Sequence, residues 1–427
     1  MAARPLAGYR VLDLSRLLPG PWCSQLLANL GADVIMIQTP TAGDHARMAP
    51  AELGFGGLFE SVNHGKRSVA VDYRRPAGRE VVLGLAHDAD VFLESSRPGQ
   101  MARRGLGPMD VRLANPRIVY CSLSGHGQIG PDRDRPSHDL DGLAVAGFLG
   151  LLNGVEGRPE PLGVRVADLA GGTLAALKIL AALVSRERTG IGATLDVAVL
   201  EAVVAWLAPR GAAASTATAG HGPFAGAFPC FHVYACADGA WLAIVALEPT
   251  LWVAACRRLE REDLASRQFD ATAITEVAAI LGTRSRHSWL AAFEADTFAA
   301  PVKHPEEAEQ DVQIGSRGPV MGDGAGAGIP SQPRAGSGAG TDVSRLTAPS
   351  LGQHTRTVLA GAGWSAAAIA RLEADGVVAG PASPEKIARA ARLSARLARM
   401  AERGATDAAA TAANNPEATG TAPARRG

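Results

Sequence analysis

The sequence predicts an α/β protein whose main domain is built on a parallel β-sheet. Short apolar strands alternate with segments of helical pattern in the first half of the chain. Units this short need right-handed crossover connections, which place successive strands parallel. The 427 residues are 47% hydrophobic and 20% charged, which is enough for two domains with buried cores.

The first half of the chain supplies the expected strands. A helix from Trp22 to Leu30 follows the first strand and should stop at Gly31, a natural C′ residue. Ligands of parallel sheets bind at the carboxyl ends of the strands. No G-x-G-x-x-G follows the first strand, so a dinucleotide fingerprint is absent. The predicted strands are 10–14, 33–37, 68–71, 91–93 and 118–122.

The second half predicts a long helix, a linker and a smaller domain. Asp168 opens a helix that runs to about Arg188, where Thr-Gly-Ile-Gly ends it. The strands 231–235 and 241–245 flank Ala-Asp-Gly, a β-hairpin signature. The division expected is 1–210 for the large domain, 211–228 for a linker, 229–320 for a small α/β domain with helices near 249–260, 273–281 and 285–295, and 321–342 for a flexible Gly-rich loop. Helices are expected at 353–360 and 365–375, before a tail over 381–427 that is helical and then disordered.

The charge balance, the cysteines and the apolar runs of the sequence indicate which partners and which cellular compartment to expect. The 42 basic and 42 acidic residues cancel, so no global field favours nucleic acid or an anionic membrane. The five cysteines form no C-x-x-C pair, which fits a reducing cytoplasm and predicts no metal site. No signal peptide is expected, and the longest apolar run, 174–184, contains Lys178 and is expected to be a buried helix.

Asp168 is the first candidate for chemistry. It precedes a Gly-Gly pair at the expected N-terminus of an apolar helix. One interpretation is an ordinary helix N-cap. The other is a reactive carboxylate beside exposed helix N–H groups, with the glycines allowing a substrate to approach closely. The two interpretations are compatible.

Two further positions are candidates for acid–base or supporting roles. His138, in a His-Asp pair, is either a surface histidine near a helix cap or a general base that titrates near neutral pH. His126 is a competing candidate. Glu248, in a Glu-Pro pair after a strand, is either a charge at a helix N-terminus or a carboxylate at a strand end. Lys66 and Arg97 lie at predicted strand edges, as turn residues or as a phosphate clamp.

In this order, the motifs resemble the family III CoA-transferases, which include formyl-CoA transferase, carnitine-CoA transferase and α-methylacyl-CoA racemase. The resemblance covers about residues 5–380. It implies a Rossmann-like large domain to which 343–380 return, a smaller α/β domain and an interlocked homodimer. It also implies an acyl-CoA thioester as substrate, no bound cofactor, and CoA contacts from Lys66, Arg97, Arg47, Gly125 and Gln128. The segments that carry it include GYRVLDLSRLLPGPWCSQLLANLGADVI, NHGKRSVAVDYRRPAGR, NPRIVYCSLSGHGQIGP, RPSHDLDGLAVAG, VRVADLAGG and LGQHTRTVL.

The resemblance leaves two reactions open. In its transferase branch, Asp168 would become an acyl anhydride and then an aspartyl-CoA thioester. In its racemase branch, His138 and Asp168 would be the two bases, with Glu248 in support, and the presence of the His-Asp pair favours this branch. Three positions depart from the usual pattern: Met36-Ile37-Gln38 replaces Lys-x-Glu, His64 replaces Arg, and Asp141-Gly142 replaces Asn-Tyr.

We therefore expect an α-methylacyl-CoA racemase or epimerase that works through an enolate. The alternative is a CoA-transferase. A third hypothesis, motivated by Met36, Gln38 and His64, is a degenerate member that binds CoA without turnover. The sequence does not reveal the acyl group, because family membership fixes a reaction site and not a substrate.

Overall fold

The structure is a computed structural model that describes residues 4–41, 43–44, 47, 57–152, 158–210, 226–293, 298–316 and 347–381. Its contacts divide the chain into two compact units. The large unit consists of Met1–Arg135, Gly171–Ala198 and Met321–Gly427. The small unit consists of Pro136–Ala170 and Val199–Val320.

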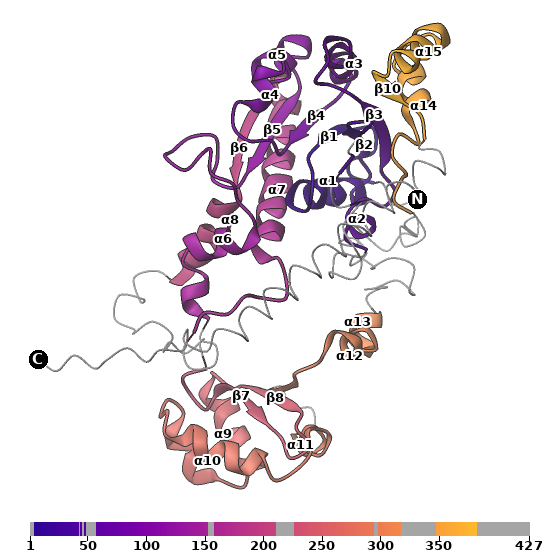
Figure 1. Ribbon diagram of the computed structural model, residues 1–427. Coiled ribbons are helices and arrows are strands. Elements are labelled where there is room, and N and C mark those ends of the chain that lie inside the picture. The colour runs from indigo at the N-terminus through magenta and orange to yellow at the C-terminus, as the bar shows by residue number, and fades with distance from the viewer. Residues whose placement is uncertain are drawn as a thin grey trace, which may run out of the picture. The chain divides into compact units, whose positions relative to one another are not determined.

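A seven-stranded sheet forms the centre of the large unit (Figure 1). Its order is β10-β3-β2-β1-β4-β5-β6, and every pairing is parallel except that of β10 with β3. The predicted parallel α/β sheet is thus confirmed. The strand order reverses between β1 and β4, the position where such sheets place their ligand crevice. The strands are β1 Arg10–Leu14, β2 Asp33–Gln38, β3 Arg67–Val71, β4 Val91–Glu94, β5 Val119–Ser124, β6 Thr194–Ala198 and β10 Val378–Ala379.

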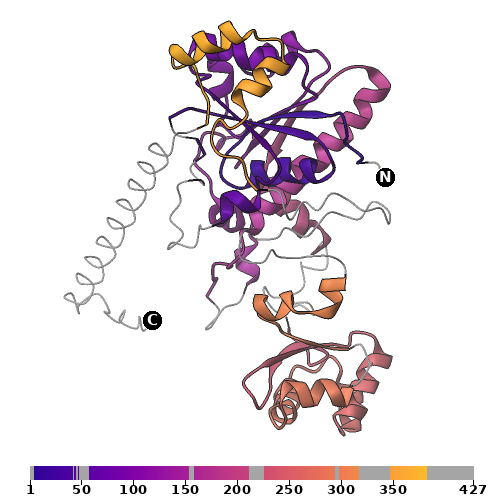
Figure 2. The same cartoon turned by 90° about the vertical axis from the view of Figure 1, so that its right-hand side faces the viewer.

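Helices cover the sheet because successive strand residues point to opposite faces. On one face, Leu12 and Ile35 join a core with Val82 of α3 and Leu359 of α14. Figure 2 shows α14 and α15, in orange, beside the purple helices of this layer. The helices of the large unit are α1 Pro19–Asn29, α2 Leu58–Ser61, α3 Pro76–His87, α4 Gln100–Arg103, α5 Pro108–Ala114, α14 Thr355–Gly361 and α15 Ala366–Ala374. Helix α7, Val166–Thr189, begins in the small unit and continues in the large one.

Helix α1 ends at Asn29, one residue before the predicted end, and begins at Pro19, three residues before the predicted start. Proline is favoured in the first turn of a helix because the N–H it lacks would have no partner there. Gly31 follows the C-cap Leu30 with a φ of 105°, a left-handed conformation that suits glycine. Helix α1 contacts α7 through a hydrogen bond of 3.1 Å from Trp22 Nε1 to Thr173 Oγ1.

Residues near the C-terminus cover the β3 edge of the sheet, where β10 pairs with β3. Ser68 N–H donates to His354 Nδ1 at 3.1 Å, and His354 N–H donates to the Ser68 carbonyl at 2.8 Å. The Ala70 N–H donates to Thr355 Oγ1 at 3.0 Å. Backbone N–H and carbonyl groups at a sheet edge need hydrogen-bond partners. This segment provides such partners for β3.

The small unit contains a three-stranded antiparallel sheet, β7-β8-β9, and its own core. The predicted hairpin is confirmed, with Phe231 opposite Val245 and Gly239 at a φ of 75° in the turn. Trp252 and Trp289 are fully buried in this core. Its elements are α6 Asp139–Val145, η3 Leu149–Leu151, α8 Val199–Leu207, η5 Ala208–Arg210, β7 Phe231–Ala235, β8 Trp241–Val245, α9 Pro249–Arg258, η8 Glu262–Arg267, α10 Ala273–Leu281, α11 Arg286–Phe293, β9 Ala299–Pro301, α12 Pro305–Glu309 and α13 Val312–Ser316.

The division into units differs from the boundaries expected from the sequence. The segment 136–170 and helix α8 group with the small unit, whereas 1–210 was expected to form one part of the large domain. The reason is tertiary, since α6 packs against α8 across about sixty residues of sequence. The expected linker lies mostly outside the described residues, as do the Gly-rich loop and most of the tail.

Helix α7 is long and apolar enough to cross a membrane by composition alone. Core helices of globular enzymes meet the same criterion. One face of α7 buries Ala175, Ile179 and Leu183, whereas Leu177 and Val184 remain 62% and 56% exposed. The expected buried helix over 174–184 is thus buried on one side only.

Candidate active site

Asp168 lies in the first turn of α7, two residues after the helix begins at Val166. It is therefore not the N-cap, and that interpretation of the sequence is wrong. The first N–H groups of a helix have no partner within the helix. The N–H of Asp168 donates to Asp139 Oδ1, on α6, at 3.0 Å. A carboxylate 29 residues away thus provides the cap.

The environment of Asp168 disfavours its charged form. The side chain is half-buried, and burial is the main cause that raises its pKa from 3.8 to about 7. The negative charge of Asp139 raises the pKa further, Arg165 lowers it, and Asp141 raises it. A carboxyl group whose pKa is raised toward neutral pH is suited to proton transfer.

His138 is the N-cap residue of α6, directly before the carboxylate that binds Asp168. The His138 N–H donates to the side chain of Asp141, and this bond stabilises the first turn of α6. The His138 side chain is exposed, and a ligand can therefore reach its imidazole.

Glu248 is the N-cap residue of α9 and is exposed. Its carbonyl accepts from the N–H groups of Leu251 and Trp252. Among the described residues it forms no hydrogen bond or ion pair with His138 or Asp168. Its expected role in orienting the imidazole stays a prediction.

The Gly-Gly pair has a packing role at its second position. A Cβ on Gly172 would lie 2.3 Å from the carbonyl oxygen of Pro19, at the start of α1. Backbone atoms cannot move aside as a flexible side chain can. Gly172 thus lets α7 approach α1 closely, which is a different purpose from the substrate approach that the sequence suggested.

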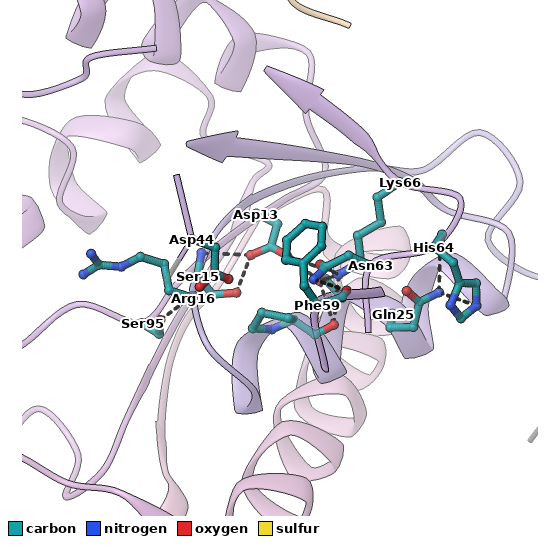
Figure 3. A network of polar contacts seen from close by, with 12 residues as sticks. Asp13, Ser15, Arg16, Gln25, Asp44, Phe59, Asn63, His64, Lys66 and Ser95 are labelled. Carbon is teal, nitrogen blue, oxygen red and sulfur yellow. Dashed lines mark hydrogen bonds and ion pairs between the residues drawn. The ribbon is translucent and has the colours of Figure 1, made fainter. Parts of the chain in front are cut away.

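Lys66 is buried next to the carboxyl end of β1 (Figure 3). Its ammonium donates to the Pro21 carbonyl at 2.9 Å, to Ser24 Oγ at 2.7 Å and to Asn63 Oδ1 at 2.8 Å. Asp13 Oδ2 lies 3.7 Å away. Burial lowers the pKa of Lys66 to about 8, and Asp13 opposes this effect. The three donors of Lys66 are used within the protein, so in this structure the ammonium does not reach a CoA phosphate.

Arg47 is also held by protein groups. Its Nη2 donates to Gln38 Oε1 at 2.8 Å, its Nη1 donates to the Pro349 carbonyl at 2.7 Å, and its guanidinium carbon lies 3.8 Å from the ring centroid of Phe59. Burial lowers the pKa of Arg47 to about 10. Gln38, one of the departures from the usual pattern, thus supplies a neutral acceptor at the end of β2.

Arg97 and Gln128 follow the ends of β4 and β5. The side chain of Arg97 is exposed and forms no ion pair with a described residue. The Gln128 N–H donates to both carboxylate oxygens of Asp196, at 3.0 and 3.2 Å, which fixes the loop that contains Gly125. Of the basic residues singled out in the sequence, Arg97 presents the most accessible charge.

A family model described as CoA-transferase family III matches residues 6–355, which span both units. The chain belongs to CoA-transferase family III. It is 32% identical to an acyl-CoA transferase of Fusarium pseudograminearum, over 87% of this chain and 88% of that protein. It is 30% identical to the alpha-methylacyl-CoA racemase of Mus musculus, over 87% of this chain and 97% of that protein.

A solved structure agrees with the fold of this family III member. A CAIB/BAIF family protein from Brucella suis matches with a TM-score of 0.73 and 27% identity, over 84% of this chain and 99% of that one. Relatives named as transferases and as a racemase both match over most of their length. The protein is therefore an enzyme that acts on acyl-CoA, of one of these two types.

Sequence reasoning missed the role of Asp139 in this family III enzyme. The His-Asp pair was visible, but only His138 was assigned a function. Nothing local in the sequence indicates that the second residue binds the N–H of Asp168. The structure brings the first turns of α6 and α7 together, and one hydrogen bond joins Asp168 to the residue that follows His138.

Proposed function

We propose that this enzyme is an α-methylacyl-CoA racemase or a close epimerase. Inversion at the α-carbon needs one group that removes the C2 proton and another that returns a proton on the opposite face. Asp168 and His138 would be these groups, and the intermediate is an enolate. The observation that carries the proposal is the hydrogen bond between Asp168 N–H and Asp139, which joins the half-buried Asp168, with its raised pKa of about 7, to the residue that follows the exposed His138.

The physical basis is the balance of protonation states. A carboxyl with an ordinary pKa is a weak base and is seldom protonated at neutral pH. Raising the pKa toward the working pH lets the same group both accept and donate a proton. A racemase converts each epimer into the other, so each of its bases must accept a proton in one direction and donate it in the other. A nucleophilic carboxylate would gain less, because only its ionised form attacks.

For the CoA portion of the substrate we propose Arg97 as a phosphate contact, since its guanidinium is exposed at a strand end. Gly125, Gln128 and Arg47 stay in the proposed CoA-binding set as residues that shape these loops. No bound cofactor is needed, because the thioester itself acidifies the α-proton.

The second candidate is a CoA-transferase, which the match to an acyl-CoA transferase over most of both chains supports. Here the Asp168 carboxylate would attack the thioester carbonyl and release CoA thiolate, leaving a mixed anhydride. The thiolate would then attack the Asp168 carbonyl and release the free acid. The aspartyl-CoA thioester would pass CoA to a second acid by the reverse of these steps.

We also propose a homodimer. The exposed face of α7 contains Leu177 and Val184, and such apolar faces on a helix are often covered by a partner. Sedimentation equilibrium should give twice the 44.0 kDa chain mass. A monomer at micromolar concentration would contradict this proposal.

One experiment separates the two activities. The enzyme is incubated with (R)-2-methylacyl-CoA, with and without a free carboxylic acid, and the products are resolved by chiral chromatography. A racemase gives the (S) epimer without an acceptor, and His138→Ala abolishes inversion. A transferase moves CoA to the added acid, and His138→Ala leaves much of that activity. No inversion at high enzyme concentration would exclude the racemase.

A further inference from the structure

We propose that Asp139 is a positioning residue, whose carboxylate ties the first turn of α7 to the first turn of α6 and so fixes Asp168 relative to His138. This inference rests on the proposed function. The bond that carries it runs from the Asp168 N–H to Asp139 Oδ1 at 3.0 Å. Both residues are half-buried, so water competes only partly for this bond.

A second contact supports the same link between the two helices. A Cβ on Gly142 of α6 would lie 3.4 Å from the Cβ of Ala167, the residue before Asp168. The two helices thus approach closely at the level of the carboxyl group. The hydrogen bond to Asp168 and the close packing at Ala167 act at adjacent residues of α7. Both contacts therefore hold its first turn against α6.

The position of Asp139 in the chain makes this link important for chemistry. Asp139 directly follows His138, and its side chain holds the main chain of Asp168. One hydrogen bond therefore sets the separation of the backbones that carry the two proposed bases. Proton transfer is sensitive to such placement, and a shift of about 1 Å can reduce a rate by about a hundredfold.

Asp139 also acts on Asp168 through its charge. The charges of three residues act on the pKa of the Asp168 carboxyl: Asp139 and Asp141 from α6, and Arg165 from the segment before α7. Asp139 is the strongest of the three and keeps the pKa of Asp168 high, in addition to the effect of burial. The hydrogen bond to Asp168 and the negative charge both come from the Asp139 carboxylate. Two substitutions of Asp139 distinguish the effect of the bond from that of the charge.

Asp139→Asn keeps an acceptor oxygen and removes the charge. It should lower the pKa of Asp168 by on the order of one unit and leave the maximal kcat within about threefold of wild type. Asp139→Ala removes the bond as well, and kcat should fall by about tenfold or more. Asp134→Asn is the control: it removes a carboxylate whose side chain is 74% exposed and that forms no bond to α6 or α7 among the described residues, and so it should leave the pKa of Asp168 and kcat unchanged.

The pKa is measured by ¹³C NMR of labelled aspartate carboxyls in the full chain, with Asp168→Asn identifying the resonance. This titration requires no activity, so it tests Asp139 even if neither racemisation nor CoA transfer is found. kcat is measured for whichever reaction the enzyme performs, and circular dichroism verifies the fold. A lower pKa in Asp139→Asn together with a lower kcat in Asp139→Ala supports the proposal. Wild-type titration of Asp168 in Asp139→Asn, or wild-type kcat in a folded Asp139→Ala, would overturn it.

Discussion

Replacing Asp168 by asparagine should stabilise the protein at alkaline pH, although it removes a group that we propose to be catalytic. The pKa of Asp168 in the folded protein is raised from 3.8 to about 7 by burial and by Asp139. Between these two values the folded state binds more protons than the unfolded state. The stability that this carboxyl contributes is therefore complete below about pH 4 and is lost as the pH rises through 7.

The size of the effect follows from the shift in pKa. Each unit corresponds to about 1.4 kcal/mol, so the full shift amounts to about 4 kcal/mol. The side chain of Asp168 is half-buried, and solvent reduces the charge penalty, so we expect about 2 to 4 kcal/mol. Asp168→Asn has no charge to bury. Its advantage over wild type should be close to zero at pH 4 and should reach this limit near pH 8.

Urea unfolding followed by circular dichroism at pH 4, 5, 6, 7 and 8 measures this difference. Comparing the two proteins at each pH cancels the titration of all other groups. Asp134→Asn provides the control, because it removes a carboxylate whose side chain is 74% exposed. An Asp168→Asn protein that is less stable than wild type at pH 8, or equally stable at every pH, would refute the reasoning.

Three further predictions follow from the large unit. Lys66→Met should destabilise the protein by about 3 kcal/mol, measured by thermal unfolding, because it leaves a buried carboxylate without its cation; an unchanged melting temperature would contradict this role. Gly172→Ala should cost about 2 kcal/mol or more in the same assay, because its Cβ would meet a main-chain oxygen, whereas Gly163→Ala, in open space, should be close to neutral. Arg97→Ala should raise KM for acyl-CoA about tenfold and leave kcat nearly unchanged; steady-state kinetics with a fall in kcat alone would argue against a phosphate contact.

Much of the fold could be predicted from local pattern. The strand 10–14 and both strands of the hairpin match their predicted limits, because apolar runs and turn residues specify them. Strand β6 was missed, since Thr194 and Asp196 are exposed and the segment lacks a continuous apolar run. β10 has two residues, which is too short for a period-two pattern.

The site was less predictable, because its decisive contacts join distant parts of the chain. Aspartate is a common N-cap residue, so the sequence around Asp168 suggests a cap. Only the structure shows that the Asp168 N–H is bound by a carboxylate 29 residues away. Lys66 follows a turn-like segment and was assigned to a phosphate. The side chain instead points into the protein, where a serine, an asparagine and a carbonyl group surround it. Sequence indicates which residue types are present, but not which way a side chain at a strand edge turns.

The most direct test of the central claim is the initial rate at which Asp168→Asn and wild-type enzyme introduce deuterium at C2 of a 2-methylacyl-CoA in heavy water. Mass spectrometry follows the product. The account predicts α-deuteration by wild type and a loss of about a hundredfold or more in Asp168→Asn with the epimer whose C2 proton Asp168 removes, because that proton-transfer group is absent. Deuteration by Asp168→Asn at the wild-type rate would contradict a role for this carboxyl in the reaction.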